Sequence, residues 1–284
     1  MSKRTKPADS DDESDVSLID VDFDCFDINP DVDFLTLKRL IKQLFGPDVE
    51  RISSHDLVEL VINQRGLGST IKTDGQESDP YAVLTILNMH VHKANPAIKS
   101  IAEYCLDKSK VDPAFHNTLS ALFSQEDKHV GFVLSERLIN MPVQVIPPMY
   151  RVLGEEVQNL VSNGQPFSFS HLLFISRAYH LTESEDAQLS SSQKKPRKNK
   201  KSKAAAVQNE DDAPRPADGV YPFHVEDELI TAASVHALDY KYSLTPTEPR
   251  DNESFGLDTR GRMMLVPVEN FPELVMAMLT KFAV

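Results

Sequence analysis

The segment 65–70 has the residue types and spacing of a phosphate-binding loop. Arg65, Gly66 and Gly68 come close to the R/Q-x-x-G-x-G/A pattern that holds the pyrophosphate of acyl-coenzyme A. Such a loop works in front of a helix, whose first N–H groups and positive dipole end bind the phosphate. Here two β-branched residues, a turn and another apolar run at 81–91 follow, and together they favour a β-hairpin. An acyl-coenzyme A-dependent acetyltransferase is therefore only an alternative function.

Three aspartates at alternate positions could also do chemistry. Asp20, Asp22 and Asp24 alternate with apolar residues, which predicts a half-buried strand with carboxylates on its exposed face. Alternate strand residues lie about 6.6 Å apart, so three carboxylates cannot close on one metal ion without further ligands. We interpret them as a solvated face, or as contacts for the Lys and Arg side chains of a basic partner.

Other features that could support catalysis are weak. The nine histidines do not cluster, and His90 and His92 lack a nearby third ligand for a metal ion. The chain has no G-x-S-x-G motif, and we interpret Cys25 and Cys105 as small core residues. We predict no catalytic, cofactor-binding or metal-binding residues, and no cofactor.

A basic run, KKPRKNKKSK, lies at 194–203. It is part of the segment 182–218, whose polar composition predicts a disordered insertion. A carrier protein can bind such a run in extended form, so we predict a nuclear localisation signal for a nuclear import carrier. A tether to nucleic acid or to an acidic protein is the alternative. The basic residues are Lys194, Lys195, Arg197, Lys198, Lys200, Lys201 and Lys203.

The rest of the chain is acidic. All 284 residues together carry −13, and the basic run supplies seven positive charges, so the remainder carries −20. This balance disfavours direct nucleic-acid binding and suits a basic protein partner, although it can also serve solubility alone. Residues 1–15 have the composition of a disordered acidic tail, in which Ser10 precedes three acids as in acidophilic kinase sites. Two cysteines without a CxxC motif indicate a reducing compartment, and the short apolar runs predict no membrane insertion.

The stretch 128–163 indicates the expected architecture. Its apolar run at 130–138 predicts a central strand, and the three- and four-residue spacing from Met149 onward predicts an amphipathic helix. We therefore predict a single α/β domain over 16–284, with a mixed central sheet and helices on both faces. Other helices are predicted after Asn29-Pro30, Asn95-Pro96 and Asp112-Pro113, and over 272–282. Other strands are predicted at 57–63, 81–91, 167–179 and 260–268, while 226–242 fits either type.

Four stretches together resemble one family. They are VDFDCFDINPDVDFLTLKRLIKQLF, GSTIKTDGQESDPYAVLTILNM, SERLINMPVQVIPPMYRVLGEEV and FHVEDELI. The chain resembles the BCCIP family over 16–284, with the tail and the insertion as the variable parts. The resemblance implies a non-enzymatic nuclear protein that shuttles to the cytoplasm. It also implies a fold like that of the Gcn5-related acetyltransferases, without their coenzyme site.

The resemblance implies partners as well. Fungal members act as chaperones for one basic large-subunit ribosomal protein, number fourteen in the universal scheme. They also support ribosome biogenesis and the nuclear export of a phosphatidylinositol-phosphate kinase. The animal member is named for a breast-cancer repair protein and a cyclin-kinase inhibitor, so a DNA-repair or cell-cycle scaffold is a further alternative.

The implied fold can be compared with the residues of this chain. In such acetyltransferases the coenzyme cradle lies between the fourth strand and the next helix, which corresponds to 137–148 here. Pro142, Pro147 and Pro148 have no backbone N–H, and the segment has no glycine that would let the chain approach a pyrophosphate. We expect this segment to bind no coenzyme.

Overall fold

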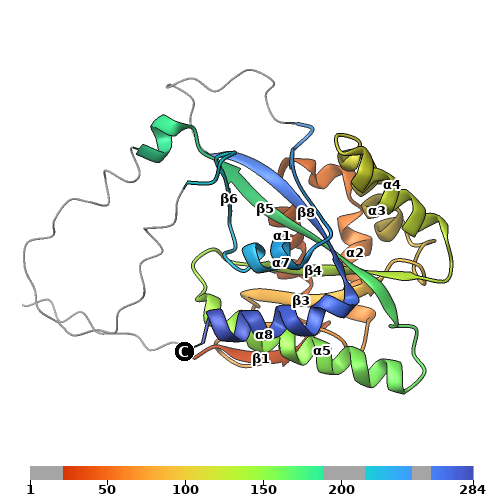
Figure 1. Ribbon diagram of the computed structural model, residues 1–284. Helices are drawn as coiled ribbons and strands as arrows, with labels where there is room; N and C mark the ends of the chain where they lie inside the picture. The colour runs from red at the N-terminus through yellow and green to blue at the C-terminus, as the bar shows by residue number, and fades with distance from the viewer. Residues whose placement is uncertain (1–21, 188–214, 245–256, 284) are drawn as a thin grey trace, which may run out of the picture.

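The computed structural model describes residues 22–187, 215–244 and 257–283 (Figure 1). Within these ranges the chain forms one sheet of eight strands, in the order β1-β2-β3-β4-β5-β8-β7, with β6 also paired to β5. Only the β4–β5 pair is parallel among the described strands. The strands are β1 (Asp24–Asp27), β2 (Ser69–Lys72), β3 (Ala82–Asn88), β4 (His129–Arg137), β5 (Phe169–His180), β6 (Val220–Pro222), β7 (His236–Lys241) and β8 (Asp258–Pro267).

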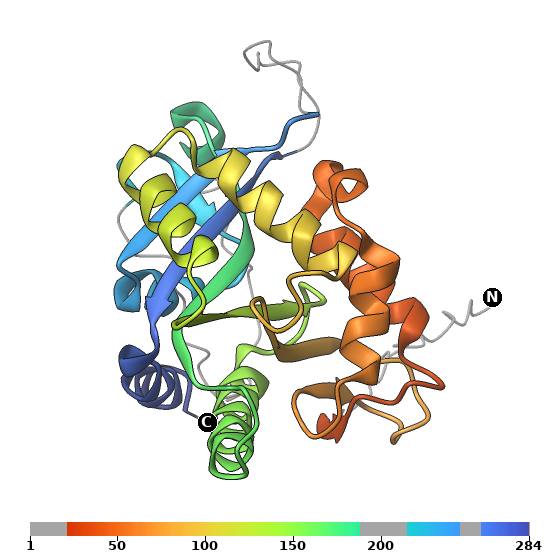
Figure 2. The ribbon, with the colours of Figure 1, turned by 90° about the vertical axis from the view of Figure 1, so that its right-hand side faces the viewer.

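Helices cover both faces of this sheet, as Figures 1 and 2 show. One face carries α1 (Phe34–Phe45), α2 (Ser54–Asn63), α3 (Pro96–Ser109) and α4 (Pro113–Ser124). The other face carries α5 (Ile146–Ser162), α7 (Asp227–Ala233) and α8 (Phe271–Lys281). The prediction of one mixed α/β domain is confirmed, with a sheet that is mostly antiparallel.

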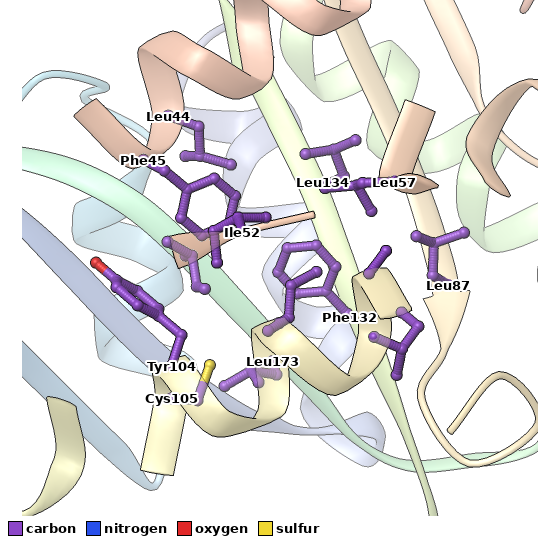
Figure 3. Packing of buried hydrophobic residues seen from close by; sticks show 14 of the residues in the cluster. Leu44, Phe45, Ile52, Leu57, Leu87, Tyr104, Cys105, Phe132, Leu134 and Leu173 are labelled. Atoms are coloured by element: carbon purple, nitrogen blue, oxygen red, sulfur yellow. The ribbon is translucent and has the colours of Figure 1, made fainter. Parts of the chain in front are cut away.

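The larger core lies between the sheet and α1 to α4 (Figure 3). Phe45 of α1 and Tyr104 of α3 meet edge to face, with ring centroids 5.6 Å apart. Phe132 and Leu173 contribute from the neighbouring strands β4 and β5. Because the central parts of β4 and β5 are buried on both faces, 130–134 and 172–175 are continuous apolar runs, which made these strands easy to predict.

Helices α3 and α4 begin as their capped prolines predict. The Asn95 carboxamide oxygen accepts the Ala97 N–H at 2.8 Å, and the Asp112 carboxylate accepts the N–H groups of Ala114 and Phe115. Helix α1 begins later than its Asn29-Pro30 signal indicates, at Phe34. Asn29 instead closes the preceding turn, where its side-chain oxygen accepts the Asp31 N–H.

The prediction of a strand at 57–63 was wrong, because these residues belong to α2. Leu57, Val58 and Val61 are the buried side chains, and their spacing places them on one face of a helix packed between α1 and α3. Three β-branched residues favoured a strand locally, and tertiary packing overrode that preference. The ambiguous segment 226–242 contains both types, α7 followed by β7. None of the helices in the described ranges is long and apolar enough to cross a membrane.

Candidate functional site

Strands β4 and β5 separate before either of them ends. Their parallel pairing runs from His129 opposite Phe169 to Val133 opposite Phe174. Beyond Val133, β4 continues to Arg137 without pairing with β5. Further along β5, the strand β6 pairs with it on the same side. The result is an opening between the two strands, with the segment after β6 running across it. This is the region in which α/β proteins commonly bind ligands.

A buried ion network fills this opening. Glu136 accepts hydrogen bonds from Arg177 Nε at 2.9 Å and from His224 Nε2 at 2.8 Å. Beside it, Arg137 Nη2 donates to Glu226 at 2.7 Å. Burial alone would raise the pKa of Glu136, but the interactions of its carboxylate with His224 and with the Arg177 guanidinium lower this pKa to about 2. Glu136 is therefore ionised at neutral pH.

Little free space remains beside the network. A cavity of about 10 Å³ lies there, lined in part by Glu136, Tyr150 and His224. That volume holds about one water molecule. A long, thin ligand such as the pantetheine arm of coenzyme A could enter only by displacing buried, paired charges, which costs several kcal/mol.

The loop after β4 is poorly suited to hold a phosphate. Helix α5 begins at Ile146, so Pro147 and Pro148 occupy its first turn. They remove two of the four N–H groups that a helix N-terminus normally leaves free.

The alternative loop at Arg65, Gly66 and Gly68 is also unsuitable. It follows the end of α2 and leads into the antiparallel hairpin of β2 and β3, as the sequence predicts. The Gly68 N–H donates to the Glu156 carboxylate at 2.8 Å, so the amide that could hold an anion already contacts an acid. A Cβ atom at Gly68 would lie 2.5 Å from Thr85, so this glycine is needed for packing.

Acidic side chains gather at one end of the neighbouring strands β1 to β4. Asp22 precedes β1 and Asp24 is its first residue, opposite the last residue of β2; both side chains are exposed. The loop from β2 to β3 then adds Asp74, Glu77 and Asp79, also exposed, with no Lys or Arg between them. All five carboxylates lie at the end of the sheet where β4 finishes.

Apolar side chains are exposed at the same edge. Leu138 follows β4 and donates its N–H to Tyr81 O at 3.0 Å, while the Tyr81 ring meets Phe23 edge to face at 6.3 Å. Ile139 is 62% exposed, which is high for an apolar side chain next to a core strand. We refer to this surface as the acidic–apolar edge, and it consists of Asp22, Asp24, Asp74, Glu77, Asp79, Leu138 and Ile139.

A buried ion pair anchors the edge to α1. Lys72, the last residue of β2, places its Nζ 2.6 Å from Asp33 Oδ1 and 2.7 Å from Gln76 O. Both charged side chains are fully buried. Asp33 also accepts the Asn29 N–H at 2.8 Å. The pair thereby joins the turn before α1, the end of β2 and the acidic loop.

The predicted site residues have different outcomes. Asp22 and Asp24 lie on the acidic–apolar edge, whereas Asp20 and the basic residues of 194–203 fall outside the described residues, as do residues 1–15 with Ser10. Of the predicted insertion, 182–187 and 215–218 are described. Cys105 is buried as expected, but the interpretation of Cys25 as a core residue was wrong, because it is exposed on the edge strand β1.

Sequence reasoning missed Asp74, Glu77 and Asp79 as site residues. A signal was present, since three acids without a base occur within the hairpin loop TDGQESDPY. What the sequence alone does not provide is the neighbourhood of this loop, because Tyr81 and Leu138 become adjacent only through the antiparallel pairing of β3 with β4.

His90 has a structural role. His90 accepts the Val130 N–H at its Nδ1 and lies 3.0 Å from Leu122 O at its Nε2, so it joins β4 to α4. The described residues contain no group of three His, Cys, Asp or Glu side chains arranged as metal ligands.

Comparisons with known proteins agree on one family. A sequence model of the BCCIP family matches residues 18–230. Protein bcp1 of Schizosaccharomyces pombe is 36% identical over 266 residues, which cover 92% of this chain and 89% of that protein. Protein bcp1 of Aspergillus fumigatus is 37% identical, covering 90% of this chain and 86% of its own.

The fold has a counterpart among solved structures. The crystal structure of BCP1 from Saccharomyces cerevisiae superposes with a TM-score of 0.62 and covers 95% of this chain and 93% of its own. At 23% sequence identity this match establishes similarity of fold.

Proposed function

This chain belongs to the BCCIP family, and from that premise we propose that it is a non-enzymatic nuclear chaperone and transport adaptor. Its client is a basic large-subunit ribosomal protein, number fourteen in the universal scheme, which it shields during ribosome biogenesis and nuclear export. BCCIP is not a known enzyme family, which supports a role that needs no turnover. Export of a phosphatidylinositol-phosphate kinase belongs to the same proposal.

The acidic–apolar edge is the observation that supports client binding best. Its five exposed carboxylates can pair with the Lys and Arg side chains that a ribosomal protein later presents to RNA. The exposed Leu138 and Ile139 add apolar contact area beside them. A surface of this kind competes with RNA for the client and releases it once RNA offers more phosphates than the edge has carboxylates.

We also propose that the fold is related to that of the Gcn5-related acetyltransferases, and that side chains fill the opening in which those enzymes bind their coenzyme. The parallel β4–β5 pair separates as a ligand site would require, and Glu136, Arg177 and His224 occupy the space. Because of this filling, the acyl-coenzyme A-dependent acetyltransferase is the weaker alternative.

An affinity purification from nuclear extract tests the proposed function. The full chain carries a tag, and the captured proteins are quantified by mass spectrometry. We expect the ribosomal protein among the most enriched species, and we expect its recovery to fall at least about fivefold with Asp74→Asn, Glu77→Gln and Asp79→Asn combined, because a rim of paired charges is lost. Enrichment of repair or cell-cycle proteins in its place would favour the scaffold alternative and contradict the chaperone role.

Nuclear entry is assigned to the basic run, whose seven Lys and Arg residues lie within ten positions. Deleting 194–203 from the chain fused to a fluorescent protein is expected to move the fusion from the nucleus to the cytoplasm. The matched control deletes ten residues of the same insertion without the run, 204–213. A fusion that stays nuclear without 194–203 would contradict this assignment.

A further inference from the structure

A groove along the outer side of α1 is lined by more basic than acidic side chains. It measures about 670 Å³ and is lined by Leu35, Lys38, Arg39 and Lys42 of α1, with Val49 and the acids Glu50 and Asp79 among its other walls. Leu35 is 71% exposed, the most exposed large apolar side chain of α1. Three cations around an apolar residue are unusual on a chain whose net charge is −13.

The cations of this groove are largely available. Arg39 Nη2 forms an ion pair with Asp79 at 3.5 Å, but both side chains are more than two-thirds exposed, so this pair contributes little energy. Lys38 and Lys42 form no ion pair with any residue in the described ranges. A groove with these cations and the exposed Leu35 fits an acidic peptide that also carries apolar side chains.

Such a peptide lies a few residues before the described part of this chain. The segment 9–15, DSDDESD, has five acids and no base, and Val16, Leu18 and Ile19 follow it. The described chain begins near the start of α1, because Asp24 of β1 lies opposite Lys72 of β2, whose Nζ is 2.6 Å from Asp33.

The distances allow the segment to reach the groove. The seven residue-to-residue steps from Asp15 to Asp22 can span about 23 Å when extended, and the twelve residues of α1 are about 18 Å long. A tether this short gives an effective concentration on the order of millimolar, so even a weak contact is occupied. Only a separate peptide present at a similar concentration could compete on equal terms.

We propose that the acidic segment 9–15 of this chain docks in the α1 groove, with its carboxylates on Lys38 and Lys42 and its following apolar residues over Leu35. The docked segment borders the acidic–apolar edge through Asp79 and adds its negative charge there. A phosphate on Ser10 would add about two more negative charges and tighten the contact. The contact does not depend on the identity of the client.

Carbodiimide cross-linking tests this contact in the full chain. The reagent joins a lysine amine to a carboxylate only when they touch, and mass spectrometry identifies the linked peptides. We expect Lys38 and Lys42 to be linked to 9–15 at least about fivefold more often than the exposed Lys99 and Lys110, and we expect the yield to fall at high salt. An even distribution over all four lysines would overturn the proposal.

Two variants test whether the cross-links depend on the apolar residue of the groove. Leu35→Ser removes the apolar contact and keeps the cations, so the links to Lys38 and Lys42 should decrease at least about threefold. The control Val111→Ser changes another exposed apolar residue, 75% accessible, and should leave the links unchanged. Equal yields in both variants would contradict docking, and links that join isotopically labelled to unlabelled chains would show a second copy as the occupant instead.

Discussion

Replacing Asp33 with alanine is expected to lower the free energy of unfolding by about 3–5 kcal/mol. The substitution leaves the fully buried Lys72 ammonium with only the Gln76 carbonyl as a partner, because its ion pair at 2.6 Å is gone. It also leaves the Asn29 N–H without its acceptor. Urea denaturation of the full chain, monitored by circular dichroism, measures the change.

A control variant and a double variant test whether the loss comes from the buried ion pair. Asp31→Ala changes an exposed acid in the same turn and should cost less than about 1 kcal/mol. The double variant Asp33→Ala with Lys72→Met removes both charges and should recover much of the loss, because a buried pair replaced by apolar groups is often tolerated. A single Asp33→Ala variant as stable as Asp31→Ala would show that the pair does not anchor the edge.

Much of the fold could be predicted from local signals. Helices α3 and α4 carry their own starting residues, Asn95-Pro96 and Asp112-Pro113, and a cap bonds only to its own first turn. The hairpin of β2 and β3 was predictable for the same reason, since turn residues separate the β-branched pair Thr70 and Ile71 from an apolar run. Each of these predictions depends on fewer than about twenty neighbouring residues.

The errors occurred where distant packing decides the outcome. Residues of α2 prefer a strand by composition, and the helix forms because Leu57, Val58 and Val61 are covered by α1 and α3. Cys25 fits an alternating pattern that predicts burial, but it is exposed on the edge strand β1, which pairs with β2 on one side only among the described strands.

The candidate site was only partly predictable. Asp22 and Asp24 were found from their alternation, whereas the acidic loop and the exposed Leu138 join them only through the order of strands β1 to β4. The ion network in the β4–β5 opening was out of reach, because Glu136 is 41 residues from Arg177 and 88 from His224. No local pattern relates residues at such separations.

Neutralising the acidic–apolar edge is expected to weaken client binding about tenfold or more. The edge variant combines Asp22→Asn, Asp24→Asn, Asp74→Asn, Glu77→Gln and Asp79→Asn. Each exposed charge pair contributes about 0.2–1 kcal/mol, so five together contribute about 1–5 kcal/mol. The middle of this range exceeds the roughly 1.4 kcal/mol that corresponds to a factor of ten. Because all five side chains are exposed, the fold should be unaffected.

A matched variant separates this surface from net charge. It neutralises five other exposed acids, so that both variants carry −8 instead of −13. These acids are Glu103, Asp127, Glu155, Glu269 and Glu273.

Calorimetric titration of the purified ribosomal protein into the full chain tests the central claim most directly. Run at about 50 mM and about 300 mM salt, it should show binding by the wild type and by the matched variant that weakens as salt rises. The edge variant should bind about tenfold or more weakly at low salt, with a smaller dependence on salt. Equal affinities of the edge and matched variants, or wild-type binding that is indifferent to salt, would contradict the role of the acidic–apolar edge.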